Sequence, residues 1–248
     1  ERNEMIAGNA GAQIIGFSIP SLNTNGFFSV MPAHATSAIP SSTTPGYAFY
    51  FQDDGWGGVS SDQIKIWEID LDWNNTSNST ISSPQQLPVT AFDSEFNSSW
   101  NDIEQPGTSQ RLDGVPTAFM YMAQYREFSG YSSVLLNHTV DVDGTDHAGI
   151  RWYELRKSGT NPWTVYQEGT YAPDAESRWM GSLCMDYQGN IGLAYSVSGP
   201  TVYPSIRYTG RYFSDPLGQM TLTEEDIIVG NDVQTSGNRW GDYGQMTL

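Results

Sequence analysis

Short runs of β-branched and aromatic residues alternate along this chain with clusters of Gly, Pro, Asn and Asp. This alternation is typical of many short antiparallel strands joined by tight turns. Helical periodicity is nearly absent, and only residues 221–228 would allow a single helical turn. We therefore predict an all-β fold, with strands near residues 13–18, 48–52, 63–71, 118–125, 133–140, 149–156, 164–167, 179–186, 191–197, 205–211 and 243–248.

The strands fall into a repeating order. The cassette Arg-Trp-Met-Gly-Ser-Leu-Cys-Met at 178–185 returns as Arg-Trp-Gly-Asp-Tyr-Gly-Gln-Met at 239–246, and Ile followed by a cation recurs at 64–65, 150–151 and 206–207. Repeats of this length are typical of blade-like β units. We predict one domain over 1–248, a β-propeller-like array of about four antiparallel blades, with a β-sandwich as the alternative.

Two further expectations concern the extent of this array. The polar stretch near 74–117 is long for a connection between blades, which predicts a loop or an insertion on one face. The second cassette stops almost as soon as it starts, so we expect the blades to be an incomplete part of a larger propeller. Further blades would then come from another chain or from the rest of a longer polypeptide.

Long motifs carry a resemblance to a known family. The segments 137–144, 149–156, 169–174, 178–182, 203–211 and 239–243 resemble a family of large secreted bacterial proteins that is taken to be β-propeller-like. The resemblance covers most of the chain and implies a secreted propeller, but it implies no activity. The turns Asp146–Gly149 and Asp186–Gly189 also resemble the Asp-box turns of sialidase-type propellers, with an Asp-to-Gly gap that is one residue longer.

Charge and composition narrow the function classes. The chain has 11 Lys and Arg against 28 Asp and Glu, a net charge of -17, which disfavours binding to the phosphates of nucleic acid. No run of residues approaches the ~20 apolar positions of a membrane helix, so we predict no membrane span. A single cysteine, two lysines and five Asn-x-Ser/Thr sequons favour a secreted or cell-surface protein.

An aspartate-rich loop is the candidate metal site. Asp141, Asp143 and Asp146 lie within six residues around a glycine and offer oxygen ligands to a hard cation such as calcium. The spacing departs from the EF-hand pattern, because glycine stands fourth and no glutamate closes the loop. The alternative is a solvated Asp/Gly hairpin between two strands, held by bonds from backbone to side chain.

A glycine-rich loop is the candidate ligand site. Asp53 and Asp54 stand three and two residues before Trp56, and indole faces stack on sugars while carboxylates accept bonds from hydroxyls. The alternative is a structural turn with Trp56 folded back onto its sheet.

We accordingly predict a non-catalytic module that binds a glycan or a protein, or forms part of an extracellular assembly. The alternative function is a glycoside hydrolase or lyase of the sialidase-like propeller type. Such an enzyme would need a pair of carboxyls in one deep pocket beside an arginine cluster. Its candidate arginines are Arg111, Arg126, Arg151, Arg178, Arg207 and Arg239, but those at equivalent repeat positions are more simply structural.

Overall fold

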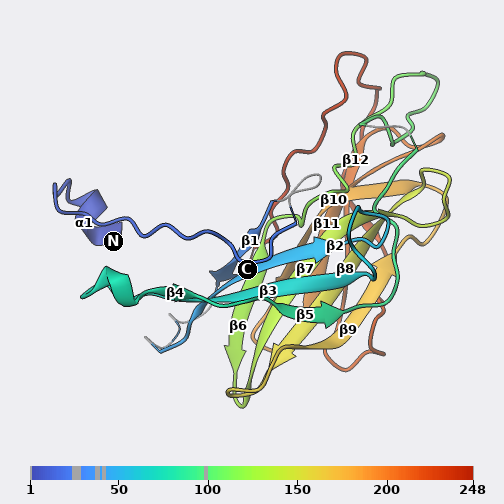
Figure 1. Cartoon of the computed structure of the whole chain (residues 1–248). Coiled ribbons are helices and arrows are strands. Elements are labelled where there is room, and N and C mark those ends of the chain that lie inside the picture. The colour runs from blue at the N-terminus through green and yellow to red at the C-terminus, as the bar shows by residue number, and fades with distance from the viewer. Residues whose placement is uncertain (1, 24–28, 37–39, 41–42, 98–99, 248) are drawn as a thin grey trace.

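The computed structural model of the chain describes residues 2–23, 29–36, 40, 43–97 and 100–247, and it confirms the all-β prediction. A large sheet curls through about half a barrel (Figure 1). Its strands are β1 (Met31–Ala35), β2 (Gly46–Gln52), β3 (Gln63–Asp70), β4 (Thr80–Ile81), β5 (Gln85–Pro88), β6 (Ala123–Phe128), β7 (Tyr131–Asp141), β8 (Ala148–Lys157) and β9 (Thr164–Tyr171).

A second sheet and two short helical segments complete the secondary structure of the described residues. The second sheet holds β10 (Ser177–Met185), β11 (Ile191–Ser198), β12 (Ser205–Arg211) and β13 (Glu225–Ile228) in that order, all antiparallel. The helix α1 (Arg2–Ile6) stands apart from both sheets in Figure 1, and one 3-10 turn covers Thr76–Asn78. Neither helical segment is long and apolar enough to cross a membrane.

The large sheet consists of two antiparallel halves joined by one parallel pairing. Strand β1 is antiparallel to β2 but parallel to β6, with His34 opposite Gln124. On one side of this junction lie β2, β3, β4 and β5, and on the other side β6 to β9 form a four-stranded meander. The parallel pairing lets the sheet turn back, so that its two halves face each other across a core.

Strands β7 and β8 form a central layer that is buried on both faces. Val134, Leu136, Tyr153 and Leu155 face the half that holds β2 and β3, where they meet Phe49, Phe51, Ile64 and Ile66. Leu135, Ile150 and Trp152 face the opposite way and pack on Leu183, Leu193 and Tyr195 of the second sheet. Both strands are therefore buried along most of their length, and this includes polar residues such as Asn137 and Glu154.

A buried glutamine connects the two sheets. Gln124 of β6 is 1% exposed, and its side chain accepts a bond from the backbone N–H of Met185 at 2.6 Å and donates to the carbonyl of the same residue at 3.3 Å. Gln124 and Met185 lie 61 residues apart, as do Tyr121 and Ser182, which also bond to each other. The period of the cassette is thus the spacing at which one four-stranded unit contacts the next.

The second cassette lies on β10 in the corresponding place. Trp179 donates its indole N–H to the carbonyl of Trp240, and the two rings lie 5.8 Å apart. Met246 donates its N–H to the hydroxyl of Ser182. The strand predicted at 243–248 is wrong for residues 243–247, which contact the sheet without strand pairing, and Leu248 lies outside the described residues.

Other differences from prediction occur where local pattern and tertiary packing disagree. Residues 13–18 form no strand and are mostly exposed; the chain is bonded to the sheet further on, where Trp67 and Lys65 of β3 donate to the carbonyls of Pro20 and Ser21. The helical turn expected within 221–228 is instead β13, which pairs with β12 and is exposed along its length. The strand expected from 118 starts at Ala123, because the preceding Phe119, Met120 and Met122 are buried in the core without strand pairing.

The stretch near 74–117 is more ordered than its composition indicates. It contains β4 and β5 and then crosses the ends of the sheets, where Ile103 and Leu112 pair with each other and are fully buried. Both pack with Ala148, Trp179 and Met180 into a core of their own. The crossing therefore holds a fixed surface over one end of the strands.

We expect Gln124→Ala to lower the free energy of unfolding by roughly 2 kcal/mol, because the N–H of Met185 would be left buried without a partner. Urea denaturation measures the change. The control is Gln86→Ala, an exposed glutamine on β5, which should alter the free energy by less than about 0.5 kcal/mol. Equal effects of the two variants would contradict the bridging role of Gln124.

Candidate functional site

Two buried aspartates anchor the turn that follows β2. Asp53 is 2% exposed and accepts bonds from the N–H of Gly55 and from both the N–H and the hydroxyl of Ser94. Asp62 is also buried and accepts from the N–H groups of Asp54 and Phe92. These bonds attach the segment around residues 92–94 to the end of β2. The role of Asp53 is therefore to position this segment.

The segment so attached forms one wall of a pocket of about 280 Å³. We call it the aromatic pocket, and it is lined by Trp56, Ser94, Glu95, Phe96, Trp100, Asp102, Pro116 and Thr117. Trp56 is half-buried and also packs on Phe51, with ring centroids 5.4 Å apart. Trp100 is 48% exposed. The pocket thus combines three aromatic rings with two carboxyl groups.

The carboxyl of Glu95 sits against the turn after β2. A Cβ at Gly55 would lie 3.1 Å from a carboxylate oxygen of Glu95 and 3.2 Å from one of Asp53, so a larger residue there would require these acids to move by a few tenths of an ångström. Partial burial raises the pKa of Glu95, and the nearby charges of Asp53 and Asp93 raise it further.

Asp102 is the most unusual acid in this region. It is 1% exposed, and its Oδ2 accepts a bond of 3.1 Å from the N–H of Gly114, while its Oδ1 has no hydrogen-bond partner. Burial raises the pKa of Asp102 to about 6, and the charges of Asp113 and Asp146 add to the effect. The hydroxyl of Thr117, also in the pocket lining, is another buried atom without a partner. Buried polar groups normally have partners, so this wall has bonding capacity that the described protein atoms leave unused.

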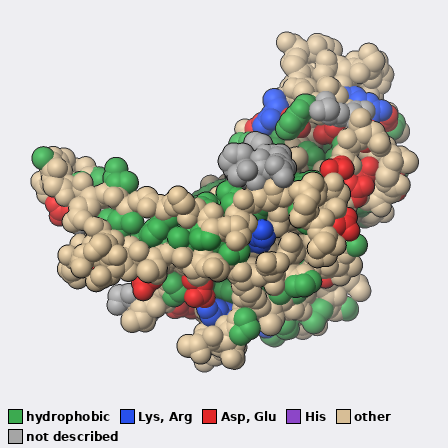
Figure 2. All heavy atoms as spheres, viewed as in Figure 1, with side chains coloured by type: hydrophobic (Ala, Val, Ile, Leu, Met, Phe, Trp, Pro, Cys, Tyr) green, Lys and Arg blue, Asp and Glu red, His purple; other side chains and the backbone are tan. Residues whose placement is uncertain are grey.

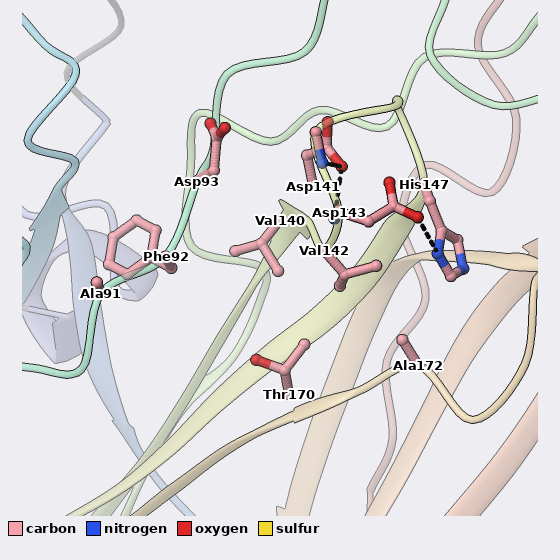
Figure 3. A pocket seen from close by; sticks show the side chains of 11 residues that line it. Ala91, Phe92, Asp93, Val140, Asp141, Val142, Asp143, His147, Thr170 and Ala172 are labelled. Carbon is pink, nitrogen blue, oxygen red and sulfur yellow. Dashed lines mark hydrogen bonds and ion pairs between the residues drawn. The ribbon is translucent and has the colours of Figure 1, made fainter.

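The predicted metal loop borders a larger, open hollow of about 700 Å³ (Figure 3). Asp141 lies in its lining but accepts bonds from the N–H groups of Asp143, Gly144 and Asp146, which close the loop. In Figure 3 the carboxyl of Asp143 turns to His147, 3.4 Å away, while Asp93 stands on a separate segment. Asp146 points elsewhere and accepts from the N–H of Asn97 at 2.6 Å.

The loop at 141–146 therefore has the bonding of a hairpin turn, and the same pattern recurs at Asp186, which accepts from Gln188 and Asn190. Among the described residues, the acids whose ligand atoms all lie within 4.8 Å of one another are Asp53, Asp54 and Asp62. Two of these three already hold backbone N–H groups. Calcium binding at either place stays a prediction.

On the face drawn in Figure 2, one group of acidic side chains lies over the loops at one end of the strands, and others lie toward the opposite end. The charges of Asp53, Asp54 and Asp141 all raise the pKa of Asp93, after the larger effect of burial. The pocket lining given above contains no Lys, Arg or His. Negative charge around the pocket is therefore not neutralised from within it.

The arginines considered for a carboxylate clamp are bound elsewhere. Arg178 is fully buried and pairs with Asp174 and Glu224, which ties β10 to the chain before β13. Each of the other five also bonds to a protein oxygen: Arg111 to Glu104, Arg126 to Met185, Arg151 to Glu168, Arg207 to Glu224 and Arg239 to Asp113. The arginines at equivalent repeat positions, which are 151 with 207 and 178 with 239, thus form ion pairs within the protein.

Comparison of the chain with models of protein families finds no match, and comparisons with curated proteins and with solved structures find none either. The family resemblance inferred from the motifs therefore stays a prediction.

Of the residues predicted for the ligand site, Trp56 lines the aromatic pocket, Asp53 supports it and Asp54 is exposed beside it. Sequence reasoning missed Glu95, Phe96, Trp100 and Asp102, which complete the pocket. The sequence did contain a signal, because Phe96 and Trp100 each lie within two positions of an acid in the stretch near 74–117 that is predicted as a polar loop.

Asp102→Asn should make the protein more stable at pH 7 and leave it nearly unchanged at pH 4. Because the pKa of Asp102 is raised from 3.8 to about 6, the folded state binds more protons than the unfolded state between these values, and stability falls as pH rises through them. The neutral amide removes that cost, which is about 3 kcal/mol.

Urea denaturation at both pH values checks the expectation. Asp186→Asn is the contrasting control, since the bonds from Asn190, Gln188 and Gly189 outweigh burial and lower the pKa of that carboxyl. It should destabilise the protein at pH 7. A loss of stability in Asp102→Asn at pH 7 would show that its charge has a partner after all.

Proposed function

We propose that this protein is a secreted or cell-surface module of β-propeller type that binds a glycan in the aromatic pocket. The observation that carries the proposal is the convergence of Trp56, Phe96 and Trp100 with Glu95 and Asp102 around one cavity. Ligand pockets combine apolar and aromatic walls with a few placed polar groups in this way.

The chemistry of the pocket suits a sugar. A pyranose ring has an apolar face that packs on aromatic rings, and hydroxyl groups around its edge that need acceptors. Trp100 offers a ring that is 48% exposed, and Asp102 offers an acceptor oxygen with no partner in the protein. A volume of about 280 Å³ is at the small end of ligand pockets, which favours one sugar unit of a longer chain.

The propeller interpretation is supported by the layered units. Strands β6–β9 and β10–β13 are four-stranded antiparallel meanders stacked face to face, with equivalent contacts 61 residues apart. The cassette at 239–246 starts the same contact on the other face of β10, where Trp240 covers Trp179. We infer that a further unit packs on this face, and that the units are blades.

The location is inferred from composition. Scarce lysine, one cysteine and the acidic surface fit an extracellular protein, and glycans are abundant there. Four of the sequons, at Asn74, Asn75, Asn78 and Asn97, start in exposed or half-exposed loops, whereas Asn137 is fully buried in β7.

A glycoside hydrolase is the second candidate, and one observation favours it. Glu95 and Asp102 are two carboxyls in the same pocket, and the raised pKa of Asp102 suits a group that donates a proton to a glycosidic oxygen. All six candidate arginines bond to oxygens of the protein, which argues against a sialidase-type clamp for an acidic sugar. A hydrolase here would act on a sugar without a carboxylate.

We expect Trp100→Ala to weaken glycan binding at least tenfold, because it removes an aromatic wall of the pocket while leaving the core intact. A glycan array identifies a ligand, and isothermal titration calorimetry then compares affinities. Trp73→Ala is the matched control, an exposed tryptophan on the polar loop outside the pocket. Equal losses in both variants, or binding to no glycan, would refute the proposed site.

The two candidate functions differ in turnover. A binding module leaves the bound oligosaccharide intact, so reducing ends should not accumulate on prolonged incubation with the array ligand. If they do accumulate, and both Glu95→Gln and Asp102→Asn stop their release while the ligand still binds, the hydrolase replaces the binding module as the function of this pocket.

A further inference from the structure

We propose that the aromatic pocket selects glycan units that carry a positively charged amine, such as de-N-acetylated amino sugars, over N-acetylated and acidic units. The inference rests on the proposed function and names the class of sugar that the same pocket takes. It follows from three features of the pocket: an unpartnered buried carboxylate, uncompensated negative charge and aromatic walls.

The unpartnered carboxylate is Asp102. Its side chain is almost fully buried in the pocket lining, where Oδ2 accepts a bond from the N–H of Gly114 and the backbone N–H of Asn101 makes a weaker contribution. A carboxylate that is taken out of water normally has a cation or several donors around it. Oδ1 has neither in the described part of the chain. An ammonium group on a ligand would supply both the charge and the donor.

The charged groups around Asp102 do not supply the cation that a buried carboxylate needs. Glu95 shares the pocket, and Asp113 and Asp146 act on Asp102 through space. The nearest cations are committed to other groups: Arg111 donates to the backbone carbonyl of Asp102 and pairs with Glu104, and Arg239 pairs with Asp113. A sugar carboxylate placed here would face two like charges, whereas an ammonium would be attracted by both.

The walls favour a cation as well. Trp56, Phe96 and Trp100 present aromatic rings to the cavity, and the face of an aromatic ring attracts an ammonium group when it is shielded from water. An amino sugar uses both properties of these rings, since its ring carbons pack on one wall while its amine meets the acids. An N-acetyl group would lose the charge and add bulk in a small cavity.

The test compares two oligosaccharides with the same backbone, a glucosamine tetramer and an N-acetylglucosamine tetramer, by calorimetry at pH 6.5. There a carboxyl with a pKa near 6 is mostly ionised and an amine is still largely protonated. We expect the amine form to bind at least tenfold more tightly, and a uronic acid oligomer to bind most weakly. The preference should shrink as salt is raised.

Two substitutions separate the pocket from the charge of the whole protein. Asp102→Asn should reduce the preference to about twofold or less while binding of the N-acetylated tetramer persists. Glu225→Gln changes the net charge equally, at an exposed position on β13, and should leave the preference intact. A preference that survives in Asp102→Asn would assign it to the overall charge of -17 and overturn the inference.

The remaining outcomes distinguish this inference from the function on which it rests. Equal affinity for both tetramers, still sensitive to Trp100→Ala, overturns the amine preference and keeps the glycan site. Binding of neither tetramer and of no other glycan overturns both. Binding of a lysine peptide instead, lost in Trp100→Ala and Asp102→Asn, would replace the sugar by a protein side chain and overturn the glycan assignment.

Discussion

The burial of β7 and β8 on both faces is the constraint on which the rest of the structure depends. Each strand supplies one set of side chains to the core shared with β2 and β3 and the alternate set to the core shared with β10 and β11. A shift of one residue in either strand would exchange the two sets, so both cores specify the same register. His138 shows how strict this is, because it is stacked 4.0 Å from Phe51 and burial lowers its pKa to about 3. It is a neutral part of the packing.

The candidate site exists because the ends of these layers are crossed by an irregular segment. Asp53 and Asp62 hold Ser94 and Phe92, and Asp141 at the end of β7 donates its N–H to the carbonyl of Asp93. Strong bonds between buried carboxylates and backbone N–H groups thus place Glu95 and Phe96 without any strand. Asp102 departs from this pattern, since one of its oxygens has no partner. A buried charge that reduces stability is typical of a site that is completed by a ligand.

Much of the fold was predictable from local pattern. Strands that are apolar on one or both faces, such as 63–70, 131–141 and 191–198, were located within a few residues, because alternation and turn residues report burial directly. Strands β1, β4, β5 and β13 were missed, since they are short, polar or exposed and are ordered by pairing with a neighbour. For the same reason the cassette is a strand at 178–185 and irregular at 239–246, where it has no partner among the described strands.

The sequence by itself determined that the protein is all-β, that it repeats with a period of 61 residues, and that its surface is strongly acidic. These properties follow from periodicity, spacing and composition, which do not depend on contacts between distant residues.

Only the tertiary structure decided which acids are structural and which have unused bonding capacity. Asp53, Asp141 and Asp102 have the same side chain, but Asp53 holds an N–H group of a distant segment, Asp141 holds those of its own loop, and Asp102 keeps one oxygen without a partner. The aromatic pocket arose the same way, from Trp56 on one turn and Trp100 on a crossing segment 44 positions later, which packing of the layers brings together.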